Sequence, residues 1–461
     1  MLVTVKARVL PLICLIALTH AAAFIVYQRP DWNTSWTDQE GYQRLGAVLA
    51  TTGMFTRYPD SPVFVPEVIR TPGYPAFVAL VYRAFGVGSH LAVAIAQAVV
   101  FAGLCVIVYG SGRRVAGERI ATAAGVAAAL FSPFPYFGAL VLTELWTAFI
   151  AALAMLVCVR AVQDRKLRDF ALAGCLLSAT TLVRPAFVLL PFFLAVAMPV
   201  LVRSERGPRA AMAWASLGVA AAVTLAPWFA YNAVYLDRFT LSPAGGIGRG
   251  LWEGAWQGRW PGRVHAQLTS FAEAATSDAD LDARVRALAA DTGLAPEPMR
   301  AYVREWRSVH AVWDTPTDPM DRTRARVVAD QEYLRLARDH IAEDPVGHTI
   351  RRLTQGTFVL WAAEVPIRYS DINATPPWVI RGLWAVQVTL AGLAVWGIVV
   401  LAKGGRWPEA ALLGLPLVYV TGVHLPLLCE ARQSLPVKPV LLTLAAVGGD
   451  AIHRRLFPLK P

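Results

Sequence analysis

Apolar runs alternate with short polar loops along most of the chain. Several of these runs approach the roughly 20 residues that an α-helix needs to cross a bilayer, and we interpret ten of them as spans. They lie at about residues 9–27, 90–110, 120–137, 143–161, 170–183, 185–202, 211–231, 378–402, 409–427 and 435–450. The pattern predicts an all-α polytopic membrane protein with about ten transmembrane helices.

Lysine and arginine are concentrated in alternate loops, as in the pair Arg113 and Arg114 after the second run. Positively charged loops stay on the cytoplasmic side of a membrane, so we expect both termini to be cytoplasmic, in the inner (plasma) membrane. The first run follows Lys6 and Arg8 and has features of a cleavable signal, but we favour an uncleaved anchor. Residues 28–89, residues 232–376 and the segment CEARQSLP then lie outside.

A further apolar run, Ala76 to Phe85, is short and is followed by Gly86 and Gly88. If this run crossed the membrane, the basic loop at residues 113–119 would lie outside, against the charge bias. We therefore predict an interfacial or re-entrant helix here.

The longest polar region, residues 232–376, lies between the seventh and eighth runs. It begins with the segment GGIGRGLWEGAWQGRWPG and continues with stretches of helical pattern. We expect it to lack an apolar core large enough for an independent domain and to cap the outer face. The chain then divides into an N-terminal membrane region (1–231) with an outer catalytic loop (28–89), the cap region (232–376) and a C-terminal membrane region (377–461).

Composition agrees with a membrane class. The chain is 56% hydrophobic and 16% charged, which is too apolar for a soluble globular protein. Its net charge of +11 lies in short loops, so it indicates contact with membrane lipids and not with nucleic acid. Its cysteines are typical of small buried hydrophobic residues, not of disulfides or metal ligands. They are Cys14, Cys105, Cys158, Cys175 and Cys429.

The segment 36–55 follows the first run directly and combines acids with an amphipathic pattern. Asp38 and Glu40 stand at its head and Tyr42 follows. Apolar residues then recur at helical spacing, which is typical of a helix on a membrane surface. One interpretation is an N-terminal helix cap with solvated carboxylates, and the other is a functional site.

Ionisable residues gather at the outer ends of the predicted spans and in the outer loops. Such residues at membrane depth are costly, and they are usually paired or functional. Any one pair is explained equally well by an ion pair that joins helix ends, whereas the whole set on one side favours a site. The set is Asp38, Glu40, Arg70, Glu144, Arg184, Glu430 and Arg432.

Acids and arginines together suit chemistry on a lipid-linked sugar phosphate. Arginine binds phosphate through a planar fork, and a carboxylate accepts the proton of an incoming hydroxyl. A phosphate leaving group needs cations and not the second carboxylic acid that glycosidases use. The sequence contains no GxxxxGK[ST] motif for ATP-driven transport and no metal-ligand spacing. We therefore expect no cofactor and assign no metal ligands, and the metal dependence stays open.

Taken in order, these segments resemble motifs of the GT-C membrane glycosyltransferases, in particular the group of the protein O-mannosyltransferases and the lipid A aminoarabinose transferase. DQEGY, from Asp38 to Tyr42, resembles an outer-loop DxxxY motif, although the family often has Asp-Glu where this chain has Asp-Gln. The other resembling segments are RTPGYP with Arg70 and Tyr74, Thr143-Glu144, LVRP with Arg184, APWFAYNAVYLDRFTLSP at 226–243 and EARQSLPVKP with Arg432.

The resemblance implies an inverting transfer of a sugar from a polyprenyl phosphate to a hydroxyl of a lipid, an envelope glycan or a protein. It implies that Asp38 is the base and that Arg70, Arg184 and Arg432 hold the phosphate. The full set of expected substrate-binding residues is Glu40, Tyr42, Arg70, Tyr74, Glu144, Arg184 and Arg432. Two other functions stay open: a secondary transporter or flippase of lipid-linked sugars, and a non-catalytic subunit of envelope assembly.

Overall fold

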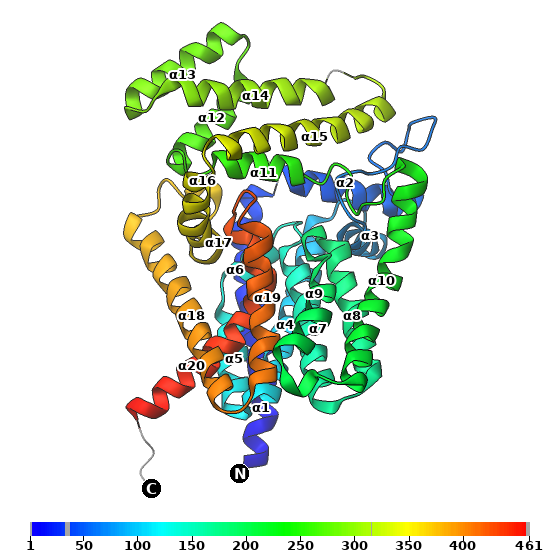
Figure 1. The fold of residues 1–461 in the computed structure, drawn as a ribbon, viewed down its shortest axis with the longest axis vertical. Coiled ribbons are helices and arrows are strands. Elements are labelled where there is room, and N and C mark those ends of the chain that lie inside the picture. Colours follow the sequence, from blue (N-terminus) through cyan, green and yellow to red (C-terminus); the bar gives the residue numbers. More distant parts are fainter. Residues whose placement is uncertain (1, 33–36, 315, 458–461) are drawn as a thin grey trace.

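The computed structural model describes residues 2–32, 37–314 and 316–457, so Trp36 at the head of the segment 36–55 lies outside the described residues. Every regular element within these ranges is a helix, which confirms the all-α class. Figure 1 shows a bundle of helices, with a layer of further helices across the end of the bundle opposite to the two termini.

Each of the ten predicted spans corresponds to a helix. Among the described residues, six segments are long and apolar enough to cross a membrane. The first segment, Val9–Asp31, includes most of α1 (Leu2–Gln28). The other five contain α4 (His90–Ala116), α7 (Glu144–Asp164), α10 (Pro208–Leu236), α18 (Pro377–Lys403) and α20 (Lys438–Leu456). The other four helices have 12 to 18 residues. These are α5 (Glu118–Leu130), α8 (Leu167–Val183), α9 (Leu190–Leu201) and α19 (Trp407–His424).

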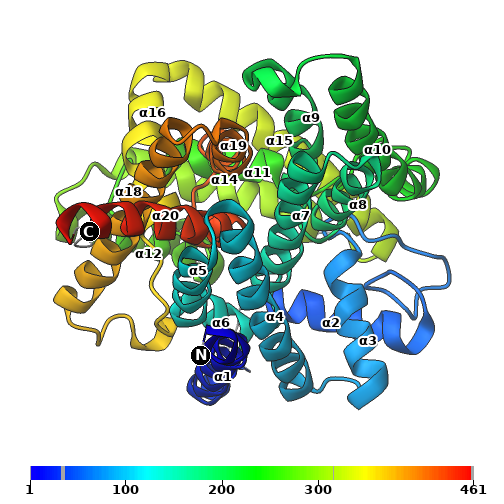
Figure 2. The same ribbon diagram turned by 90° about the horizontal axis from the view of Figure 1, so that it is seen from below.

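The bundle has a centre and a rim. Seen from the end that carries the termini, α7 lies near the middle and α1 at the edge (Figure 2). The most apolar stretch of α7 is 67% buried within the protein and that of α1 only 17%. Most of the apolar surface of α1 is therefore left to contact lipid. Short helices join the long ones: η1 (Arg29–Asp31), α6 (Pro133–Gly138), η2 (Pro185–Phe187), η3 (Arg203–Glu205), η5 (Tyr369–Asp371) and η6 (Ala431–Val437).

The basic loops meet at the end of the bundle where the termini lie. Arg114 pairs with Asp164 at 3.3 Å, which joins the ends of α4 and α7. Trp407, at the start of α19, donates a hydrogen bond to the carbonyl of Leu201 at the end of α9. The grouping that the charge pattern predicted is therefore present, and the candidate site lies at the opposite end.

Two helices lie across the site end of the bundle. The first, α2 (Thr37–Thr52), crosses that end and packs against α3 (Gly73–Phe85) (Figure 1). With 13 residues and a rise of about 1.5 Å per residue, α3 is about 20 Å long, shorter than the roughly 30 Å hydrocarbon core of a bilayer. The interpretation of the run from Ala76 to Phe85 as less than a full span is confirmed.

The region 232–376 corrects one expectation, because it has an apolar core of its own. Its helices are α11 (Ile247–Trp256), α12 (Gly262–Ala274), α13 (Asp278–Thr292), α14 (Pro296–Asp314), α15 (Pro319–Glu343), α16 (Pro345–Arg351), η4 (Arg352–Gly356) and α17 (Thr357–Ala362). Buried aromatic and aliphatic side chains from α11 to α15 form one cluster around Trp252, Trp256 and Tyr302. The sequence did not predict this core because each helix contributes only a few apolar residues to it and has a strongly charged exposed face.

Candidate functional site

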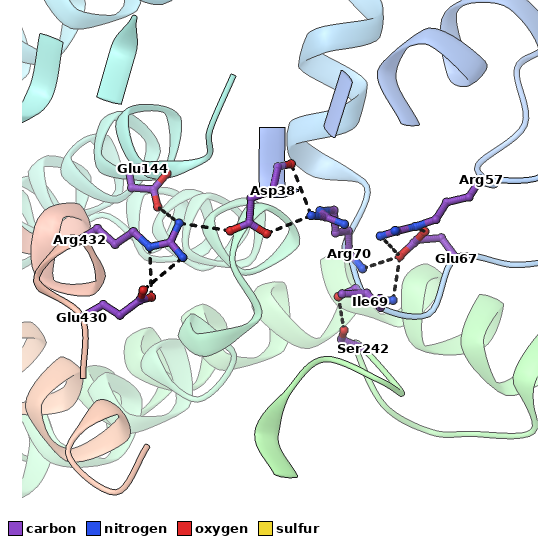
Figure 3. Close-up of polar contacts among 9 residues, drawn as sticks. All are labelled: Asp38, Arg57, Glu67, Ile69, Arg70, Glu144, Ser242, Glu430 and Arg432. Atoms are coloured by element: carbon purple, nitrogen blue, oxygen red, sulfur yellow. Dashed lines mark hydrogen bonds and ion pairs between the residues drawn. The ribbon is translucent and has the colours of Figure 1, made fainter. Parts of the chain in front are cut away.

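Asp38 lies in the first turn of α2 and both its carboxylate oxygens are paired with arginines. Oδ1 accepts a hydrogen bond from Nη2 of Arg70 at 3.0 Å, and Oδ2 accepts one from Nη1 of Arg432 at 3.2 Å (Figure 3). The two arginines are more than 360 residues apart in the chain. Partners from two distant segments make Asp38 more than the cap of its own helix, and its side chain is still 43% exposed.

Arg432 connects three acids. It lies in η6, the short helix between α19 and α20, and Nε donates to Glu430 at 3.1 Å. Nη1, which binds Asp38, also lies 3.6 Å from Glu144 (Figure 3). A guanidinium group with five donors in a fixed plane can hold several carboxylates at once, so Arg432 joins the α2, α7 and η6 ends of the bundle.

Glu144 and Arg184 form the deep side of the cluster. Glu144 begins α7 and is 2% exposed, while Arg184 follows the last residue of α8. Nη1 of Arg184 lies 3.7 Å from Oε1 of Glu144. Both Oε2 of Glu144 and Nη1 of Arg184 are buried without a hydrogen-bond partner among the described residues. Unsatisfied buried donors and acceptors are costly, so these atoms are available to a bound ligand.

The loop before α3 fixes Arg70 through its backbone. Oε1 of Glu67 accepts hydrogen bonds from the amides of Ile69 at 2.8 Å and Arg70 at 3.0 Å, and Glu67 also pairs with Arg57 (Figure 3). On the other side, the guanidinium group packs against Gly41 of α2, which has no side chain to obstruct it. A Cβ at Gly41 would lie 2.5 Å from Cζ of Arg70.

Aromatic side chains pack against the guanidinium group of Arg70. Its guanidinium group lies over the ring of Tyr42, 4.6 Å from the centroid. Tyr42 meets the buried ring of Tyr74 edge to face at 5.1 Å, and the Tyr74 hydroxyl donates to Gln97 at 3.2 Å. Tyr42 and Tyr74 therefore belong to the support of the arginine.

Glu40 is the one predicted site residue that the structure does not bring to the cluster. It is exposed, because residues two positions apart on a helix point to different faces. Asp38, Tyr42, Arg70, Tyr74, Glu144, Arg184 and Arg432 are brought together at one end of the bundle.

Charge keeps the Asp38 carboxyl ionised. Burial by itself raises the pKa of Asp38, but the guanidinium groups of Arg432 and Arg70 outweigh this effect and hold the pKa below its ordinary value. Asp38 is thus a carboxylate at neutral pH, able to accept hydrogen bonds or a proton.

A further acid near the cluster was not among the predicted site residues. Glu364, between α17 and α18, is buried, and its burial raises its pKa to about 7 while the charge of Lys438 works in the other direction. The charges of Glu144 and Arg432 also act on it. The only signal was an acid between two apolar runs, in WAAEVP.

Over residues 2–32, 37–314 and 316–457, no group of three or more His, Cys, Asp and Glu side chains is arranged to hold a metal ion. The acids that do converge, Asp38, Glu144 and Glu430, converge on the guanidinium group of Arg432.

Known proteins share parts of this sequence and this fold. The sequence model of the dolichyl-phosphate-mannose-protein mannosyltransferase family matches residues 69–231, the stretch that carries Arg70, Tyr74, Glu144 and Arg184. No curated protein sequence matches the chain.

Solved structures cover nearly the whole chain. The archaeal oligosaccharyltransferase AglB from Archaeoglobus fulgidus, in complex with an inhibitory peptide and a dolichol-phosphate, aligns with a TM-score of 0.53 at 12% identity, over 99% of this chain and 53% of AglB. ArnT from Cupriavidus metallidurans, bound to undecaprenyl phosphate, aligns with a TM-score of 0.41 at 14% identity, over 96% of this chain and 79% of ArnT.

The chain spans about half the length of AglB, and at 12% identity the likeness is one of fold. The family match and this fold agree with the order of motifs along the sequence. Residues 69–231 are similar to the dolichyl-phosphate-mannose-protein mannosyltransferase family, and the fold of the whole chain is similar to that of AglB.

Proposed function

We propose that the protein transfers a sugar from a polyprenyl phosphate to a hydroxyl acceptor at the outer face of the membrane, with inversion at the anomeric carbon. One observation carries the proposal: the half-exposed carboxylate of Asp38 lies between Arg70 and Arg432. A proton acceptor and two phosphate-binding groups thus occupy one site, where a lipid headgroup would meet water.

Three arginines suit the phosphate of the donor. Arg70 and Arg432 present guanidinium groups to the half-exposed Asp38, and Nη1 of Arg184 is a buried donor that has no hydrogen-bond partner among the described residues. Guanidinium groups bind phosphate in a bidentate way and stay charged. The family match to dolichyl-phosphate-mannose-dependent enzymes and the dolichol-phosphate bound to AglB support a lipid phosphate as the ligand.

The chemistry is a single displacement. The acceptor oxygen forms a bond to the anomeric carbon while the bond from that carbon to the phosphate oxygen breaks, and the lipid phosphate leaves with the electron pair. Asp38 takes the hydroxyl proton, and the arginines stabilise the charge that develops on the leaving phosphate. One displacement inverts the configuration, because the acceptor attacks opposite to the phosphate.

Donor binding would also prepare the base. In the free protein, Arg70 and Arg432 hold the pKa of Asp38 down. A phosphate that takes over these guanidinium groups weakens their effect on Asp38, so the pKa of Asp38 rises toward the working pH, where a general base is most effective.

This competition predicts a shift between two pH profiles. The acidic limb of kcat, which reports the donor complex, should lie at higher pH than the acidic limb of kcat/KM, which reports the free enzyme. Activity falls below each limb because the base is protonated there. Coincident limbs would contradict an exchange of arginine partners.

The donor is tested by binding. Purified protein in nanodiscs should bind undecaprenyl phosphate, and undecaprenol, which has the same tail without the phosphate, should bind much more weakly. Equal binding of the two lipids would contradict a phosphate site, since the apolar tail alone would then account for the affinity.

Orientation is tested by labelling in intact cells. In a background without the five cysteines, which are all free and include the exposed Cys175, single cysteines would replace the exposed residues Glu40, Ala279 and Lys403. An impermeant thiol reagent should label positions 40 and 279 and leave 403 unlabelled until the cells are opened. The reverse pattern would place the site in the cytoplasm.

Gly41→Ala tests the contact of Asp38 with Arg70. The new Cβ would displace the mobile end of Arg70 and not the backbone, while alanine favours the helix by roughly 0.5–1 kcal/mol. Because a hydrogen bond to a charged group contributes about 1.5–3 kcal/mol, we expect transfer to fall roughly tenfold to hundredfold without loss of thermal stability. The matched control is Gly382→Ala in α18, where a Cβ meets open space; equal activity of the two variants would remove Arg70 from the reaction.

A further inference from the structure

The glycine- and tryptophan-rich segment 245–262 has no part in the proposed chemistry, yet it lies against the loop that leads to Arg432. Its helix α11 is anchored on one side by α15. There a Cβ at Gly248 would lie 1.9 Å from the carbonyl oxygen of Asp330, and the Asp330 carboxylate accepts from the amides of Gly248 and Arg249. The cap region thus holds α11 rigidly.

The opposite side of α11 contacts residues 426–429, the loop after α19. The amide of Leu428 donates to the carbonyl of Gly250 at 2.7 Å. A Cβ at Gly254 would lie 2.7 Å from the carbonyl oxygen of Pro426 and from the carbonyl carbon of Leu427. Such proximity of helix and backbone leaves no room for a side chain, which explains the glycine at this position.

Gln257, directly after α11, binds the same loop through its side-chain amide. Oε1 accepts from the amide of Cys429 at 2.9 Å, and Nε2 donates to the carbonyl of Cys429 at 2.8 Å. Oε1 also accepts from Nη1 of the buried Arg352 at 2.7 Å, and this nitrogen donates to the carbonyl of Leu427 at 3.0 Å.

These contacts fix a segment that has no helix or strand over the described residues 427–430. From the other side, Gln433 accepts from the amide of Glu430 at 3.1 Å and donates to the carbonyl of Leu428 at 3.0 Å. Glu430 follows Cys429 directly, and Arg432 follows two residues later. The backbone that precedes Arg432 is therefore held by Gln257 on one side and by Gln433 on the other.

We propose that Gln257 is a positioning residue of the donor site, which acts through Arg432 and makes the cap region a part of donor binding. This inference rests on the proposed function, because it assigns Arg432 to the lipid phosphate. It also accounts for the glycines of α11, since they allow the backbone contact that brings Gln257 to Cys429.

The test compares binding of undecaprenyl phosphate by the full-length protein in nanodiscs. Gln257→Ala loses three hydrogen bonds, so its dissociation constant should rise about tenfold or more. Gln257→Glu keeps the acceptor for Cys429 and Arg352 but loses the donor to the Cys429 carbonyl, so its dissociation constant should rise less. If the alanine variant does not fold, the glutamate variant tests the role of Gln257. Gln267→Ala, an exposed position on α12, is the matched control and should bind normally.

A double-mutant comparison separates positioning from general loss of structure. Because Gln257 acts through Arg432, adding Gln257→Ala to the Arg432→Ala variant should weaken binding little further. Additive losses, or a Gln257→Glu variant that binds as well as the Gln267→Ala control, would overturn the inference. If instead wild-type protein binds undecaprenol as well as undecaprenyl phosphate, the proposed function itself is wrong.

Discussion

Replacing Asp38 by Asn should lower transfer by roughly the hundredfold to ten-thousandfold that a general base contributes, while the protein folds and still binds donor. Asparagine has nearly the same shape and keeps an oxygen for one arginine, but it cannot accept a proton. The measurement is release of free polyprenyl phosphate from a polyprenyl-phosphate sugar by purified protein, compared with its binding of undecaprenyl phosphate.

Two neighbouring acids serve as controls for Asp38. Glu40→Gln should be nearly neutral, because Glu40 is exposed on another face of α2. Glu364→Gln tests the other buried acid near the cluster, whose pKa is raised to about 7 by its burial. Normal turnover by Asp38→Asn together with an inactive Glu364→Gln would move the base to Glu364, and normal turnover by all three variants would exclude Asp38, Glu40 and Glu364 as the base.

Removing the arginines should weaken donor binding strongly. We expect Arg432→Ala and Arg184→Ala each to raise the dissociation constant of undecaprenyl phosphate roughly tenfold to hundredfold, from the 1.5–3 kcal/mol that a charged hydrogen bond contributes. Lysine at position 432 should restore part of the binding, since it keeps the charge but lacks the planar fork.

Stability must be measured alongside, because Arg432 also pairs with the buried Glu144. A lower melting temperature in Arg432→Ala would reflect a buried carboxylate that has lost a partner, and Arg432→Lys then carries the comparison. Arg286→Ala, at an exposed position on α13, is the matched control. Wild-type affinity in both the Arg432 and Arg184 alanine variants would reduce these arginines to structural partners of Glu144 and Glu430.

The sequence predicted much of the fold because each membrane span is a long apolar run that can be recognised in the sequence. Apolar length and loop charge located a helix for each expected span, and they also placed Asp38, Glu144, Arg184 and Arg432 at one end. Residues at the same ends of packed helices must lie near one another, so their gathering followed from topology. Glu40 was misplaced because two positions along a helix turn a side chain to a different face.

Other parts could not be predicted for physical reasons. The core of the cap region depends on how short amphipathic helices stack, which a pattern of single helices does not define. Gln257 reaches Cys429 across 172 residues of chain, through a side-chain amide that bonds to backbone. Such a contact leaves no repeating pattern of residues in the sequence, so nothing distinguishes Gln257 from any other polar residue of the region.

The central claim, transfer from a polyprenyl phosphate that depends on Asp38, is tested most directly in cells. Mass spectrometry of envelope lipids and glycans would compare cells that produce the wild-type protein with cells that produce Asp38→Asn at equal abundance. The account predicts that one polyprenyl-phosphate sugar accumulates in the Asp38→Asn cells while one sugar attached to a hydroxyl acceptor disappears. Identical polyprenyl-phosphate sugars and identical acceptor glycosylation in the two strains would contradict it.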